Sequence, residues 1–211
     1  MKRASVKLLF ALVWWLAGSL GAAYSQNFER MSDIESEQFG DRALVNSTDY
    51  QTIKNVRRYW GQEAQRLKQA KQLDVNLTGG NETILKVTIP ARLLFVQNDS
   101  TMLANADNML RPILRLVKGN EALATIIVGG YSDNNGSERY LALLSGGRAR
   151  QVHRWFAKQG VGPNDIRSFG FGSRVPRNEN ATIAQREKNR RISLFLVPNK
   201  KMLKAAKKGN L

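Results

Sequence analysis

The 211-residue sequence contains no cysteine. This absence excludes disulfide bonds, cysteine-based zinc sites and thiol nucleophiles, and it excludes attachment of a lipid through an N-terminal cysteine. The chain is long enough for one ordinary domain with extra segments. Its 42% of hydrophobic residues is typical of a packed core and argues against disorder.

Catalytic motifs are also missing. The single histidine, His153, has no second ligand or nucleophile at a motif spacing, and its position within a predicted helix favours a structural or solvent-facing role. No G-x-S-x-G elbow, Walker loop or H-E-x-x-H motif occurs. The "GFGS" stretch at residues 170–173 is too short to indicate a phosphate loop, and no motif pairs two carboxylates. We therefore predict that the protein is not an enzyme and has no cofactor and no metal site.

Acidic residues are few. The sequence has 17 Asp and Glu residues and 33 Lys and Arg residues, which gives a formal net charge of +16. Such a chain is attracted to polyanions: nucleic acid, anionic lipid or an acidic polymer of the cell wall.

The N-terminus indicates the compartment. A positive start, "MKRASVK", precedes a run without charge at residues 8–23, and small residues follow at 23 and 25. This pattern predicts a secretory signal peptide at residues 1–25. An uncleaved membrane anchor is the alternative, although the run is short for a membrane span. Either reading places the remaining chain outside the cytoplasm, in the periplasm, so nucleic acid is not expected as a partner.

Residues 26–80 read as an N-terminal helical and linker segment. Apolar side chains recur at helical spacing over residues 49–72, behind a capping-box pattern at residues 48–51 with Thr48 as N-cap, and basic residues lie between them. The apolar stripe either packs on the chain's own domain or contacts a membrane or partner. The "TGGN" stretch at 78–81 marks a boundary.

The next part of the chain, residues 81–198, has the pattern of one α+β domain. Stretches typical of strands lie at residues 84–95, 122–131, 166–172 and 191–198. Helical patterns lie at residues 98–120, where Pro112 is expected to kink or divide the helix, and at residues 145–160, with Ser145 as N-cap and Gly160 after the C-cap. The order β-α-β-α-β-β predicts a sandwich with a small mixed sheet and helices on one face. Residues 199–211 read as a loose basic tail.

The stretch "GGYSDNNGSERYLALLSGGRAR" combines an acid and an arginine. Asp133 follows a predicted buried strand, and Arg148 lies in the first turn of a helix that would begin at Ser145. An arginine at a core edge requires a carboxylate, because burial of an unpaired guanidinium is costly. Two interpretations stay open: Asp133 and Arg148 pair with each other, or they clamp a zwitterion such as an amino-acid head group.

Several motifs, in the same order, resemble the C-terminal domain shared by OmpA, the peptidoglycan-associated lipoprotein and MotB. They are "IPARLLFVQNDSTML", "GYSD", "LSGGRA", "SFGFGSRVP" and "EKNRRISL", and the resemblance covers about residues 82–198. The resemblance implies non-covalent binding of peptidoglycan through diaminopimelate in its stem peptide.

Site residues follow from this resemblance. Asp133 would hold the diaminopimelate ammonium, and Arg148 would hold a carboxylate. Asn98, Asn135 and Arg191 correspond to further contacts, whereas Arg190 corresponds to a structural position. The family often has asparagine where this chain has Leu141, so one hydrogen bond to the ligand is expected to be lost.

We therefore expect a cell-envelope protein that clamps diaminopimelate and anchors envelope components to the wall, associated with the wall or the outer membrane. The alternative is an envelope assembly or interaction protein that uses the OmpA-like domain as a scaffold. In that case residues 26–80 and the basic tail would bind an outer-membrane or envelope protein.

Overall fold

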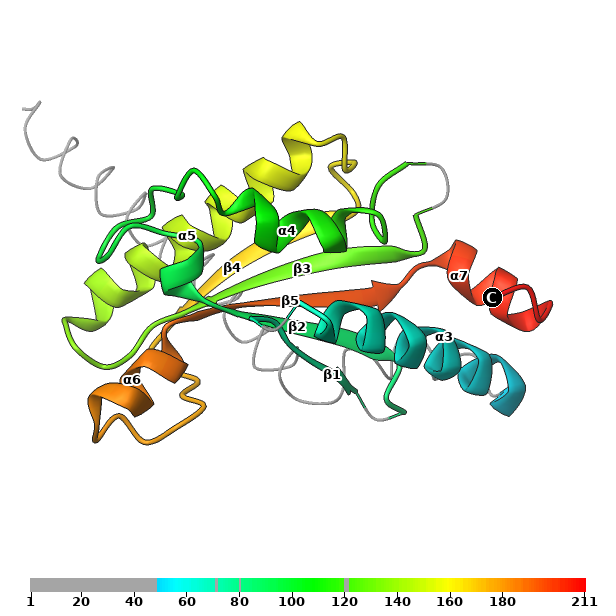
Figure 1. Cartoon of the computed structure of the whole chain (residues 1–211), viewed down its shortest axis with the longest axis horizontal. Helices are drawn as coiled ribbons and strands as arrows, with labels where there is room; N and C mark the ends of the chain where they lie inside the picture. The colour runs from blue at the N-terminus through cyan, green and yellow to red at the C-terminus, as the bar shows by residue number, and fades with distance from the viewer. Residues whose placement is uncertain (1–48, 71, 80, 120–121) are drawn as a thin grey trace, which may run out of the picture.

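A computed structural model of the chain describes residues 49–70, 72–79, 81–119 and 122–211 (Figure 1). The expected signal peptide and Thr48 lie outside these residues. Within the described residues, no helix is both long enough and apolar enough to cross a membrane.

A five-stranded mixed sheet forms the centre of the molecule. Its strands are β1 (Asp74–Thr78), β2 (Ile84–Pro90), β3 (Ala124–Tyr131), β4 (Ile166–Gly172) and β5 (Arg191–Pro198). They lie in the order β1-β2-β5-β3-β4; β3 and β4 are parallel, and the other neighbours are antiparallel. The central strand β5 is buried along its whole length, as its apolar sequence requires. The predicted α+β class is confirmed, whereas β1 was not predicted.

Helices lie over one face of this sheet and at one of its ends. They are α3 (Tyr50–Lys68), α4 (Asp107–Leu114), α5 (Glu138–Lys158), α6 (Ile183–Asn189) and α7 (Lys200–Lys207). Helix α6 is the one at the end of the sheet (Figure 1). Side chains of α3, α4, α5 and α7 share one core with alternate residues of the strands, such as Val87, Val128 and Leu194. The other face carries smaller clusters, one around Ile127 and Phe195 and one formed by Tyr131 and Phe171.

Residues before the expected boundary at 80 belong to this same core. Strand β1 pairs with β2 in an antiparallel hairpin, and Val56, Trp60 and Leu67 of α3 are buried. The apolar stripe of α3 therefore packs on its own domain. The helix begins behind Asp49, whose carboxylate accepts the Gln51 amide and the Thr52 hydroxyl.

Helix α5 begins earlier than predicted. Its N-cap is Ser137, which accepts the Tyr140 amide, and Ser145 lies inside the helix. The Ser145 hydroxyl instead donates to the Ala142 carbonyl and accepts the Gly172 amide of β4. Arg148 is consequently a mid-helix residue and does not lie in the first turn of the helix, as was predicted. Gly160 follows the C-cap in the left-handed conformation, as predicted.

The predicted helix over 98–120 was too long. Residues 95–102 form a tight hairpin closed by a β-bridge between Phe95 and Met102, and only Asp107–Leu114 is α-helical. The Asp99 carboxylate accepts the Ser100 and Thr101 amides, which favours a turn over a helix. Pro112 lies within α4, which ends two residues later.

The C-terminal residues are not a loose tail. Asn199 caps α7, whose Met202 and Ala206 are fully buried in the main core. Helix α6 was also not predicted, although Thr182 and Gln185 form a capping box at its start.

Candidate functional site

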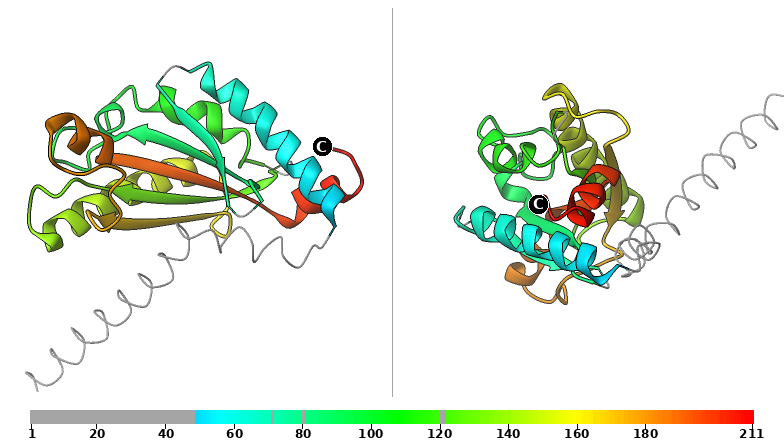
Figure 2. Two further views of the ribbon diagram at one scale, coloured as in Figure 1. Left: turned by 90° about the horizontal axis from the view of Figure 1, so that it is seen from below. Right: turned by 90° about the vertical axis from the view of Figure 1, so that its right-hand side faces the viewer.

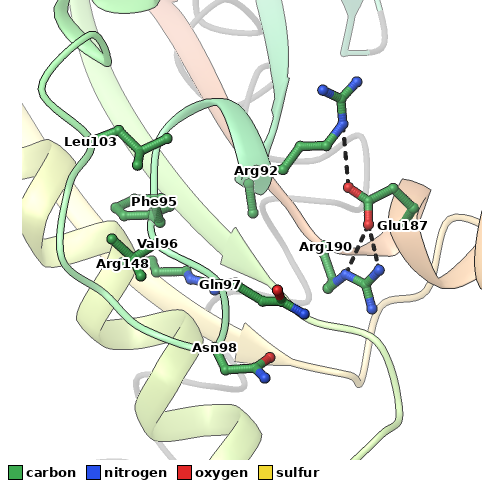
Figure 3. A pocket seen from close by; sticks show the side chains of 10 residues that line it. Arg92, Phe95, Val96, Gln97, Asn98, Leu103, Arg148, Glu187 and Arg190 are labelled. Atoms are coloured by element: carbon green, nitrogen blue, oxygen red, sulfur yellow. Dashed lines mark hydrogen bonds and ion pairs between the residues drawn. The ribbon is translucent and has the colours of Figure 1, made fainter.

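A cavity of about 660 Å³ opens at one end of the sheet, between α5, the residues after β2 and the end of α6 (Figure 3). It is lined by Ala91, Arg92, Phe95, Val96, Gln97, Asn98, Leu103, Arg148, Glu187 and Arg190. Three guanidinium groups and one carboxylate line the same space, with an apolar floor.

Arg148 reaches the cavity from the middle of α5. Arg148 is buried. Its Nε donates to the Asp99 carbonyl at 2.9 Å, and its guanidinium lies 5.4 Å from the centre of the Phe95 ring. Burial lowers the pKa of Arg148, and the positive charge of Arg190 lowers it further, while Tyr140, Asp133 and Asp99 oppose the shift. The group remains a cation, because arginine keeps its proton in proteins.

The hairpin over residues 95–102 supplies the opposite wall. Asn98 adopts a left-handed backbone conformation with φ of 55°, which asparagine tolerates better than most residues. The Tyr140 hydroxyl donates to the Asn98 carbonyl at 3.4 Å, and Arg148 binds the next carbonyl. Two side chains of α5 thus hold the hairpin, and Asn98 lines the cavity.

Asp133 lies two residues beyond β3 and pairs with Arg190, not with Arg148. Arg190 Nη1 donates to Asp133 Oδ2 at 2.6 Å, and Arg190 also contacts Glu187. Glu187 in turn lies 3.4 Å from Arg92 Nε, so the four side chains form a chain of alternating charge. Hydrogen bonding and charge from Glu187 and Asp133 outweigh the effect of burial and raise the pKa of Arg190.

Three of the predicted residues, Asp133, Asn135 and Arg191, are not among those that line the cavity, and Asp133 is joined to the lining through Arg190. Asn135 is exposed, and its backbone amide donates to Asp133 Oδ1 at 3.2 Å, so it orients the acid. Arg191 is buried with its guanidinium 3.8 Å from the centre of the Tyr131 ring, and it donates to the Asn189 and Val175 carbonyls. Arg190, expected to be structural, lines the cavity, and Arg191 does not.

Sequence reasoning also missed Glu187 and Arg92. Glu187 precedes Arg190 by three residues, a spacing that pairs opposite charges on a helix and so gave a usable signal. No local signal marks Arg92, which reaches Glu187 only because the chain turns after β2.

The site can bind a ligand that carries both a positive and a negative group, because Asp133 and Arg148 are not paired with each other. An anionic group that entered the cavity would meet Arg148 in a partly dehydrated site, where charge-assisted hydrogen bonds are stronger. Asp133 Oδ1 has only the Asn135 amide as a hydrogen-bond donor among the described residues. Arg190 contacts Glu187 as well as Asp133, so it would keep one carboxylate partner if a ligand ammonium bound Asp133.

The sequence model of the OmpA family matches residues 94–190, the part that carries this cavity. This part of the chain is therefore similar to the OmpA family and is called the OmpA-like domain below, together with β2 and β5, which complete its sheet outside the match. The match begins in the turn after β2 and ends at Arg190, so it contains Asn98, Asp133, Arg148 and Glu187.

Curated relatives agree with this assignment of the OmpA-like domain. Outer membrane protein A of Bordetella avium is 31% identical over 116 residues, which are 55% of this chain and 59% of that protein. The peptidoglycan-binding protein ArfA of Mycobacterium tuberculosis is 39% identical over 73 residues, which are 35% of this chain and 22% of that protein. The chain thus covers less than two thirds of either relative.

Solved structures share the fold of the OmpA-like domain. A MotB-like protein from Desulfovibrio vulgaris superposes with a TM-score of 0.60 at 18% identity and covers 70% of this chain and 96% of that one. The cell wall anchor of the T6SS from Pseudomonas aeruginosa has a TM-score of 0.56 at 20% identity and covers 65% and 96%.

Proposed function

We propose that this chain is a non-catalytic peptidoglycan-binding protein of the periplasm that clamps diaminopimelate and anchors envelope components to the wall. The observation that carries the proposal is that Arg148 lines the cavity, while Asp133 lies behind the lining residue Arg190 and has no bond to Arg148. Asp133 binds Arg190, and Arg148 binds a backbone carbonyl. An ammonium and a carboxylate on one carbon, as at the side-chain end of diaminopimelate, match this pair.

Other observations support the same function. A relative of the domain is named a peptidoglycan-binding protein. His153 lies on α5 outside the cavity lining, so no histidine is placed there for acid–base chemistry. The net charge of +16 favours approach to an anionic wall.

The affinity for a single stem peptide is expected to be modest. Charge-assisted hydrogen bonds contribute about 1.5–3 kcal/mol each, and ordering the ligand offsets part of that. Two or three such bonds give a dissociation constant on the order of micromolar to millimolar. Repeated stem peptides on the wall then raise the apparent affinity.

The test is sedimentation of the purified full chain with insoluble diaminopimelate-type wall. We expect Asp133→Asn and Arg148→Ala each to weaken binding about 10-fold or more, because each removes one charge-assisted contact with the ligand. Glu179→Ala and Arg154→Ala remove one exposed charge of each sign outside the cavity lining and should bind like the unchanged chain.

Two results would contradict the proposal at different levels. Equal sedimentation of Asp133→Asn and the unchanged chain would reject the clamp. Because asparagine keeps the shape of the side chain, misfolding would not explain a loss of binding in this variant. Equal binding to lysine-type wall, whose side chain offers an ammonium without the carboxylate, would reject diaminopimelate as the recognised group. Thermal unfolding of each variant checks that Arg148→Ala is folded.

A further inference from the structure

Helices α3 and α7 together present a strongly basic surface, which we call the basic helix face. Helix α3 and residues 199–211 contain ten Lys and Arg residues and one acid, Glu63. All ten of these cations are exposed, and the basic helix face is defined here by six of them: Lys54, Arg58, Lys200, Lys204, Lys207 and Lys208.

The lysines of α7 occupy one side of that helix. Lys200, Lys204, Lys207 and Lys208 follow the spacing of four, three and one residues that places side chains on one helix face. Met202 and Ala206 lie on the opposite side and are fully buried. Core packing therefore fixes the direction in which the four lysines point.

The two helices are joined directly. The Asn55 amide donates to the Ala206 carbonyl at 2.9 Å, and Arg58 donates to the Leu211 carbonyl at 3.3 Å. The Thr52 hydroxyl is the main cause of a lowered pKa at Asp49, and the charge of Lys207 contributes to it. The cations of α3 and α7 thus form one surface.

Little negative charge is available to neutralise this surface. Glu63 is buried and already contacts Arg115 and Arg66. Glu82 pairs with Arg57 at 2.5 Å. Asp49, at the start of α3, is an exposed carboxylate near Lys207, and the six cations of the basic helix face outnumber it.

The basic helix face lies at the end of the molecule opposite α6 and the cavity. Helices α3 and α7 lie side by side at one end of the long axis in Figure 1, and both face the viewer in the right-hand view of Figure 2. The described chain starts at Asp49 beside this face, directly after the segment whose sequence holds the uncharged run at residues 8–23.

We propose that the basic helix face docks on an anionic lipid surface while the opposite end of the molecule is left free for other contacts. Tyr50 is 76% exposed at the start of α3, one turn before Lys54, and tyrosine is favoured at the headgroup level of membranes. Lysines on a helix with buried apolar residues beneath are attracted to anionic headgroups as point charges. Nucleic-acid binding would favour arginine forks and stacking aromatic rings, whereas α7 carries only lysine among its charged residues.

The test compares flotation of the full chain with vesicles of pure phosphatidylcholine and of phosphatidylcholine with about one third phosphatidylglycerol. The variant Lys204→Gln, Lys207→Gln, Lys208→Gln keeps helix-forming residues and removes three charges. Each lysine near an anionic lipid surface strengthens binding about five-fold, so the triple variant should lose about 100-fold of the binding that depends on phosphatidylglycerol. The binding that depends on phosphatidylglycerol should also weaken when salt is added.

A matched triple variant separates the surface from net charge. Arg150→Gln, Arg154→Gln, Lys158→Gln removes three exposed charges from α5 and should keep the phosphatidylglycerol dependence. Equal losses in both triple variants, or equal binding to the two vesicle types, would overturn the proposal. Tighter binding to double-stranded DNA than to vesicles, lost in the same α7 variant, would also overturn it. The α7 variant should still sediment with the wall, so a failure here is distinct from a failure of the clamp.

Discussion

Gly170 and Gly146 are the residues at which α5 and β4 approach most closely. A Cβ added at Gly170 would overlap the backbone nitrogen and Cα of Gly146, which cannot move without displacing the helix. The nearest neighbour of a Cβ added at Gly146 would be the flexible end of the Arg150 side chain, at 3.3 Å. The pair of glycines sets the distance between the helix that carries Arg148 and the sheet that carries Asp133.

We therefore predict that Gly170→Ala destabilises the protein by about 1–3 kcal/mol or more, because overpacking forces backbone shifts. Gly146→Ala should cost much less. Gly61→Ala is the matched control on α3: nothing lies within 4 Å of the added Cβ, so alanine should stabilise the helix by about 0.5–1 kcal/mol. Urea unfolding of the three variants measures these differences, and an unchanged midpoint for Gly170→Ala would contradict the close approach.

Single residues also show how far the site was predictable. Asp133 and Arg148 were identified before the structure because each has a motif around it, and both lie at the cavity end. The exchange of Arg190 and Arg191 was not predictable, because consecutive residues at the start of a strand point to opposite sides. A difference of one residue in where β5 begins decides which arginine faces the cavity.

At the scale of elements, the strands were predicted better than the helices. Strands β4 and β5 coincide with their apolar sequence runs. The start of α5 was predicted at Ser145 because serine is a favoured N-cap residue. Packing on β4 outweighs that preference, because Ser145 and Gly146 lie at the contact with the sheet. The observed N-cap, Ser137, directly follows a glycine-rich loop.

Helix α7 was missed because its lysines resemble a disordered tail. Met202 and Ala206 are the two fully buried apolar residues of α7. The stability that they contribute depends on packing against α3, which is distant in sequence. The predicted segment at residues 26–80 is therefore not separate from the domain over its described part, because α3 and β1 contribute to the same core.

The cap of α7 gives a prediction for this element. Asn199 Oδ1 accepts the Lys201 and Met202 amides, and its Nδ2 donates to the Ala122 carbonyl at 2.8 Å. Asn199→Ala removes all three bonds and should lower the free energy of unfolding by about 1–2 kcal/mol. Asn199→Asp keeps the cap and should lose less. Equal losses in a denaturant titration would show that the cap itself contributes little.

At the scale of the whole molecule, the two functional proposals use opposite ends. The cavity lies beside α6, and the basic helix face lies beside the two ends of the described chain (Figure 1). The central strand β5 connects them, since it runs from Arg191 near the cavity to Pro198 before α7. The fold thus holds the cavity and the basic helix face apart at a fixed spacing.

Stability between pH 5 and 7 should depend on one side chain, because His153 is the only histidine in the sequence. Burial is the main cause of its lowered pKa, and Arg154 adds to the effect. The unfolded chain therefore takes up this proton more readily than the folded one. The stabilisation is complete above the unfolded pKa of about 6.5 and decreases as the pH falls through it towards the folded value.

Aspartates act in a separate window at lower pH. The pKa of Asp99 is lowered mainly by the Thr101 amide, and that of Asp107 mainly by the Trp155 ring nitrogen. Their stabilisation is complete above about pH 4 and is lost as the pH falls through their folded values. In His153→Gln the melting temperature should therefore change less between pH 7 and pH 5. Its decrease below pH 4 should remain. A slope between pH 7 and 5 that survives in His153→Gln would assign the effect to other groups.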